Sequence, residues 1–140
     1  MHEATLEFGK RVTLLTGENG LGKSFVLDVA WWAMTRCWPS FPATPELGVS
    51  DEPRIEWDFM GRSGPSSGSS VFNIEEGVWP RGPGRPTNPG LVIYARADGS
   101  FAVWDPSRNY WRTAESVGVD QPDRPGAFLF SSAEVWEGLE

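Results

Sequence analysis

The pattern of hydrophobic residues divides the chain into a helical first part and a strand-rich remainder. A short apolar run at residues 11–16 precedes a glycine-rich loop, and its apolar members are Val12, Leu14 and Leu15. This run predicts a strand that is buried in a sheet. A longer apolar run predicts a helix over residues 23–37, which Pro39 ends because proline cannot continue a helix. The sequence therefore predicts a strand, a loop and a helix within residues 5–38.

The predicted helix is apolar around most of its circumference. Asp28 and Arg36 lie eight positions apart and mark one polar stripe, and Trp32 falls on the same stripe. We expect Val29 and Trp31 in the core, and a milder loss of stability when Trp32 is removed. Trp32 is either partly exposed or covered, by a later segment of this chain or by another chain.

Residues 54–130 combine strand-like runs with turn signals, which predicts a β-rich subdomain. Residues 54–60 alternate apolar and polar side chains, as in a half-buried strand. Residues 61–70 are mostly glycine and serine and predict a flexible connection to a second, antiparallel strand at 71–79. The Asp98-Gly99 dipeptide between two apolar runs predicts a hairpin. The expected fold class is α/β, in which the strand, the glycine-rich loop and the helix are followed by an antiparallel β-meander.

A further helix is predicted to begin near the end of the chain. Ser131 and Glu134 are spaced as a capping box, which marks a helix N-terminus. The sequence ends six residues after Glu134. We therefore expect only the start of a helix at residues 131–140, with Trp136 exposed.

Composition limits the classes of function. The 140 residues suffice for one domain. Twelve basic and 19 acidic residues give a net charge of −7, which disfavours a general electrostatic contact with nucleic acid. One cysteine and one histidine allow neither an internal disulfide nor a Cys/His metal cluster. No signal sequence and no apolar stretch of roughly 20 residues is evident, so we expect a cytoplasmic protein without a membrane partner.

The glycine-rich loop has the spacing of a nucleotide-binding motif. Residues 17–24, GENGLGKS, match G-x-x-x-x-G-K-[ST] between a predicted strand and a predicted helix. Backbone N–H groups of such a loop surround phosphates, the lysine reaches the β- and γ-phosphates, and the hydroxyl holds Mg²⁺. Glu18 and Asn19 are expected to shape the loop rather than to catalyse. The predicted ATP-binding residues are Gly17, Glu18, Asn19, Gly20, Leu21, Gly22, Lys23, Ser24 and Phe25, with Ser24 as the Mg²⁺ ligand.

Hydrolysis would also require a carboxylate that holds Mg²⁺ and a residue that orients water. Asp105 follows four apolar residues, but the preceding hairpin makes its strand antiparallel, whereas the expected strand is parallel to its neighbour. Asp58 lies within a predicted strand, and Gln121 lies in a loop. Asp105 and Gln121 therefore remain alternative Mg²⁺ ligands, and no catalytic residue is assigned.

The sequence GENGLGKS after LEFGKRVTLLT resembles the N-terminal lobe of ABC-type "AAA family" ATPases, which include the structural-maintenance-of-chromosomes and RecF-like proteins. The resemblance implies ATP and Mg²⁺ at residues 17–24. It also implies a partner, either a missing C-terminal half or a second ATPase lobe, with DNA contacted through the complete protein. The serine-rich signature and the acidic pair of the family do not occur in this sequence. We therefore expect an N-terminal fragment or half of a split protein that does not turn over ATP alone.

Two other functions remain open. The chain could be a small self-sufficient P-loop kinase, with Asp105 or Asp58 catalytic and Arg81 or Arg85 in a lid. It could also be a β-rich interaction module that retains a vestigial phosphate loop.

Overall fold

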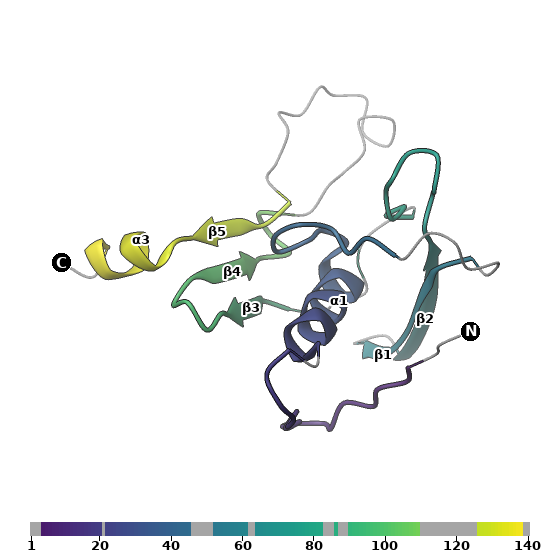
Figure 1. The fold of residues 1–140 in the computed structure, drawn as a ribbon, viewed down its shortest axis with the longest axis horizontal. Coiled ribbons are helices and arrows are strands. Elements are labelled where there is room, and N and C mark those ends of the chain that lie inside the picture. The colour runs from purple at the N-terminus through teal and green to yellow at the C-terminus, as the bar shows by residue number, and fades with distance from the viewer. Residues whose placement is uncertain are drawn as a thin grey trace.

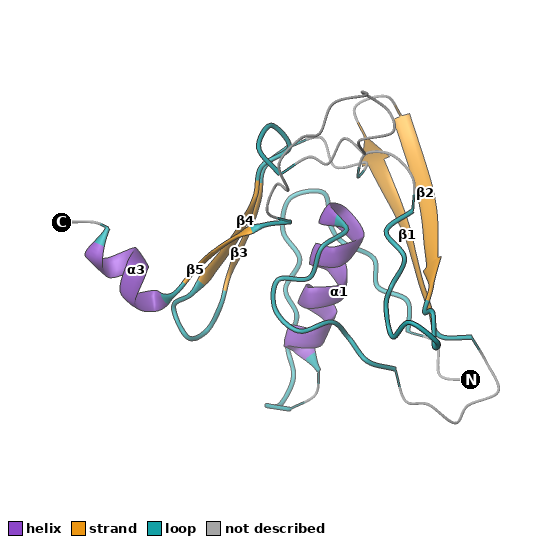
Figure 2. Ribbon diagram, turned by 90° about the horizontal axis from the view of Figure 1, so that it is seen from above, coloured by secondary structure: helices purple, strands orange, loops and turns teal. Residues whose placement is uncertain are grey.

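A helix lies between two antiparallel sheets (Figures 1 and 2). The computed structural model describes residues 4–20, 22–45, 52–61, 64–82, 86, 90–109 and 126–138. The elements are α1 (Lys23–Thr35), β1 (Arg54–Gly61), β2 (Gly64–Val71), β3 (Val92–Ala95), β4 (Phe101–Trp104), β5 (Phe128–Phe130) and α3 (Ser132–Glu137). One sheet pairs β1 with β2, and the other has the order β3-β4-β5. The predicted mixture of helix and antiparallel strands is confirmed. Among the described residues, neither the length nor the hydropathy of any helix is sufficient to span a membrane.

One side of α1 packs on the three-stranded sheet through Trp31. The Trp31 side chain is buried with Ala102 and Trp104 of β4, and its ring centroid lies 6.2 Å from that of Tyr94 on β3. Cys37, just beyond the helix, belongs to the same cluster, and its thiol donates a hydrogen bond to the carbonyl of Gly126, 2.9 Å away. This contact ties the segment before β5 to the end of α1.

The next residue, Trp32, packs on the two-stranded sheet. Successive helical residues point about 100° apart, so Trp31 and Trp32 enter different clusters. Trp32 is only 1 % exposed, and the side chains around it are Val29, Trp38, Ile55, Trp57, Phe72 and Trp79. Of the two alternatives for Trp32, cover by later segments of the same chain is confirmed. The expectation of an apolar helix buried on most sides fails near its start, because Phe25 and Leu27 are exposed.

Helix α1 ends at an arginine rather than at the proline. Arg36 has a positive φ of 60°, which is uncommon for a residue with a Cβ, and its N–H donates to the carbonyl of Trp32. Its guanidinium lies over the ring of Trp57, with Cζ 3.7 Å from the centroid. The helix end and the β1 strand are thus joined by a cation–π contact.

Strand β1 confirms the prediction for residues 54–60, and its inward-facing residues are Ile55, Trp57 and Phe59. The predicted flexible connection at 61–70 is wrong, because most of it is strand β2, antiparallel to β1. Glycine and serine have low strand propensity, but the indole ring of Trp57 lies over this strand. Trp57 pairs with Gly68, and a Cβ on Gly68 would come 2.6 Å from Cε2 of the indole. The absence of a side chain there allows Trp57 to cover the strand.

The remaining prediction for this region, a strand over 71–79, is also wrong. Strand β2 ends at Val71, and Asn73 and Val78 then form a single bridge around a turn. The Asn73 side-chain oxygen accepts from the N–H groups of Glu75 and Glu76, at 3.0 and 3.1 Å. An asparagine that satisfies two backbone donors in this way favours a turn over a continuing strand.

The predictions for the second sheet and for the helix after it agree with the structure. The Asp98-Gly99 hairpin is confirmed between β3 and β4, with Gly99 at a φ of 81°. The capping box is confirmed, because the Ser131 hydroxyl accepts from the N–H of Glu134 while the Glu134 carboxylate accepts from the N–H of Ser131. Helix α3 has six residues and none of them is buried, as expected for a helix start with Trp136 exposed.

The predicted buried strand at 11–16 is wrong. These residues form no strand, and Val12 and Leu14 are 83 % and 82 % exposed. A strand requires a neighbour for its backbone hydrogen bonds, and no described strand pairs with this segment. In Figure 1 it belongs to the purple trace that leads from the N-terminus to the start of α1. The apolar pattern of residues 11–16 is real, but the sheet that it requires is not among the described elements.

Candidate functional site

Residues 17–24, the phosphate loop, turn sharply into α1. Gly17, Gly20 and Gly22 have φ values of 152°, 88° and 76°, which favour glycine because a Cβ would be strained there. Gly22 is the N-cap of α1 and provides no side-chain cap. Leu21 lies outside the described residues. Three of the predicted glycines thus occupy positions where their conformational freedom is used.

Lys23 closes this loop from the first residue of the helix. Its ammonium donates to the carbonyl oxygens of Gly17, at 2.7 Å, and Glu18, at 2.5 Å. The side chain therefore folds back across the loop instead of extending into solvent. Two neutral carbonyls hold the positive charge, and a phosphate oxygen offers a stronger, charge-assisted partner in the same region.

The helix start adds backbone donors to the site. The first hydrogen bond of α1 runs from the N–H of Val26 to the carbonyl of Gly22, at 3.0 Å. The N–H groups before it have no partner within the helix, and they carry the positive end of its dipole. No acidic residue lies in the first turn, while Ser24 and Phe25 are exposed. This end of α1 is chemically suited to an anion.

Asp105 does not lie at this end of α1. Trp104 before it packs with Cys37, which follows the last turn of α1, whereas Lys23 begins the helix. A helix of 13 residues spans about 20 Å, so the two ends are far apart. The Asp105 carboxylate instead accepts from the hydroxyl and N–H of Ser107, at 2.7 and 2.8 Å, which holds its pKa below the ordinary value. The structure gives this aspartate a turn-stabilising position.

The remaining candidates from the sequence are Asp58, Gln121, Arg81 and Arg85. Asp58 is exposed on β1, opposite Ser67, and faces away from the aromatic cluster that packs on α1. Gln121 and Arg85 lie outside the described residues, and Arg81 is exposed in the segment after Trp79. Within the described ranges, no three Asp, Glu, His or Cys side chains are placed to hold a metal ion.

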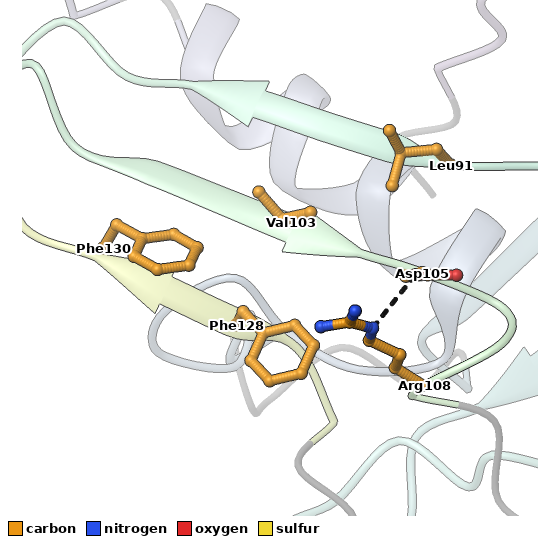
Figure 3. Close-up of a pocket in the computed structure, with 6 residues that line it drawn as sticks. All are labelled: Leu91, Val103, Asp105, Arg108, Phe128 and Phe130. Carbon is orange, nitrogen blue, oxygen red and sulfur yellow. Dashed lines mark ion pairs between the residues drawn. The ribbon is translucent and has the colours of Figure 1, made fainter. Parts of the chain in front are cut away.

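A feature that sequence analysis missed is a pocket on the outer face of the second sheet (Figure 3). It has a volume of about 350 Å³, and its lining residues are Leu91, Val103, Asp105, Arg108, Phe128 and Phe130. The alternation of side chains in β4 could have indicated this outer face, because Ala102 and Trp104 face α1 and Val103 must face outward. The pairing of Val103 with Phe128 could not be read from the sequence.

No protein-family model, curated protein or solved structure matches this chain. The basis for a functional assignment is therefore the motif at residues 17–24 together with its geometry.

Proposed function

We propose that residues 17–24 bind the phosphates of Mg-ATP, and that the chain is the ATP-binding lobe of an ABC-type ATPase. The observation that carries this proposal is Lys23, whose ammonium is folded over a glycine loop of matching spacing at the first residue of α1. The exposed helix N-terminus beside it offers further N–H donors.

The residues of the loop have distinct roles in this proposal. Phosphate oxygens replace the carbonyls of Gly17 and Glu18 as partners of the Lys23 ammonium. Gly20 and Gly22 have open space where a Cβ would stand, so an anion can approach the backbone closely. The exposed Ser24 hydroxyl fits Mg²⁺, which in nucleotide sites takes phosphate oxygens and water as most of its ligands.

A lobe of this kind acts with a partner. Asp105 lies near the opposite end of α1 from the phosphate loop, and Asp58 faces away from α1, so the proposal assigns hydrolysis to a second ATPase lobe or to a C-terminal half. Any contact with DNA is assigned to the complete protein as well, because the net charge of this chain is −7.

The test uses the two lysines of the chain, Lys10 and Lys23. Thermal unfolding is measured with and without millimolar Mg-ATP for the original protein, Lys23→Ala and the control Lys10→Ala. Ligand at a hundredfold excess over its Kd stabilises the folded state by about 2.7 kcal/mol. We expect an upward Tm shift that Lys10→Ala retains and Lys23→Ala loses. Superimposable melts of the original protein with and without Mg-ATP would contradict the proposal.

One observation favours the interaction module as a second candidate. Residues 11–16 present exposed apolar side chains and pair with no described strand, which is unlike the buried strand expected before a functional phosphate loop. This candidate predicts no Tm shift with Mg-ATP in any variant. The small kinase has no comparable support, since Asp105 lies near the opposite end of α1 from Lys23.

A further inference from the structure

The outer face of the β3-β4-β5 sheet combines apolar side chains with an ion pair between Arg108 and Asp105. Val103 on β4 and Phe128 on β5 are paired in register, and Phe130 lies two residues further along β5 on the same face. Figure 3 shows Arg108 reaching from the turn after β4 into the pocket, with its guanidinium group between Phe128 and Asp105. The resulting pocket of about 350 Å³ is at the small end of ligand sites, the size for one large side chain rather than for a nucleotide.

The arginine at the pocket edge can pair with an acidic occupant. The Arg108 Nε atom lies 3.8 Å from Asp105 Oδ2, and the arginine side chain is 75 % exposed. An exposed ion pair at this distance contributes little to stability, so Arg108 can turn to another carboxylate at low cost.

Helix α3 has the complementary chemistry. It projects beyond β5 in both views of the molecule, and none of its residues is buried (Figures 1 and 2). Trp136 is 71 % exposed, and Glu137 follows it directly. A helix of six residues is marginal in water unless it packs on a surface. An exposed tryptophan beside a glutamate matches an apolar pocket edged by an arginine.

No residue of this helix lines the pocket of its own chain. Ser131 is the single residue between β5 and α3, and its backbone is extended, with φ −68° and ψ 162°. The helix therefore continues outward from the strand that lines the pocket instead of turning back over it. A second copy can present its own α3 to this pocket, and each copy then supplies one pocket and one helix, as two-fold symmetry requires.

We propose that two copies of this chain pair reciprocally, with Trp136 of each copy in the pocket of the other and Glu137 beside Arg108. In this arrangement Phe128 and Phe130 bury the indole ring, and the Asp105 carboxylate can accept the indole N–H. The pair requires no nucleotide, so it is independent of the phosphate loop.

Sedimentation equilibrium of the full chain over a wide concentration range tests the pairing. We expect a monomer–dimer equilibrium whose dissociation constant rises about tenfold or more in Trp136→Ala, as for a central aromatic residue of an interface. The matched control is Phe41→Ala, which removes another exposed aromatic side chain, 90 % accessible and outside the pocket and α3. Phe41→Ala is expected to leave the equilibrium unchanged.

Charge reversal separates a direct contact from a loss of folding. Arg108→Glu should weaken the dimer, and the double variant with Glu137→Arg should restore it, because the two new charges again attract. The proposal is overturned if the original chain is monomeric at all concentrations, if it forms species larger than a dimer, or if Trp136→Ala dimerises normally. It is also overturned if the double variant is no tighter than Arg108→Glu.

Discussion

Replacing Trp32 by alanine is expected to lower the free energy of unfolding by about 3–5 kcal/mol, the range for removal of a buried large aromatic side chain. The side chain is 1 % exposed and lies among three other tryptophans. Its ring centroid is 5.7 Å from that of Trp38 in a stacked arrangement, 5.7 Å from that of Trp57 edge-on, and 6.2 Å from that of Trp79.

The same magnitude follows from the surface involved. A buried aromatic side chain removes about 150–250 Å² from water, worth roughly 4–6 kcal/mol at 25 cal/mol per Å². Removing it also opens a cavity that strands β1 and β2 cannot fill without moving. Since a domain of this size is stable by about 5–15 kcal/mol, the loss is a large fraction of the total. The structure therefore reverses the expectation that removal of the Trp32 side chain causes only a mild loss of stability.

Val29→Asp provides the comparison. Val29 is partly buried at the edge of the same cluster, so an aspartate there can turn toward water and avoid part of the cost of burying a charge. We now expect Trp32→Ala to be at least as damaging as Val29→Asp, the reverse of the order that the helical pattern predicts.

Urea unfolding followed by far-UV circular dichroism measures these changes without relying on tryptophan fluorescence. Phe41→Ala is the control, and its cost should stay within about 0.5 kcal/mol because the side chain is exposed. The reasoning is refuted if Trp32→Ala has the same urea midpoint as Phe41→Ala, since the aromatic cluster would then not hold α1 on β1 and β2.

Three further predictions concern other parts of the chain. Gly68→Ala should destabilise the protein by about 1–3 kcal/mol in the same titration, because the new methyl group must displace the Trp57 ring. The Glu134 carboxyl should titrate in NMR below the ordinary value of about 4.3, since the Ser131 hydroxyl and N–H stabilise its charged form; Ser131→Ala should raise that pKa. Because the folded pKa is lowered, the stabilisation is present at higher pH and is lost as the pH falls through the folded pKa. Steady-state phosphate release from Mg-ATP by the original protein should not exceed the release by the Lys23→Ala variant.

Features set by neighbouring residues could be predicted from the sequence. The start of α1 after the phosphate loop, the Asp98-Gly99 turn and the capping box at Ser131 all depend on backbone geometry within a few residues. The predicted site at residues 17–24 is likewise local, and the folded-back position of Lys23 is compatible with its predicted role. Its ability to bind Mg-ATP stays a prediction.

Features set by distant residues could not be predicted in this way. Gly68 lies in a segment of low strand propensity, yet it belongs to a strand that pairs with β1 and lies under the ring of Trp57. The pocket edged by Arg108 exists only once β5 has paired with β4. The apolar run at 11–16 shows the opposite outcome, because it has the pattern of a strand but no neighbouring strand within the described residues.

Trp31 and Trp32 show both kinds of feature, those set by neighbouring residues and those set by distant ones. The sequence predicts that both residues are helical and that their side chains diverge, because each helical residue turns by about 100°. That a separate sheet covers each side chain, β3 and β4 on one side and β1 and β2 on the other, is evident only from the folded arrangement. Helical periodicity describes directions around one axis, whereas burial depends on which distant segments arrive on each side of it.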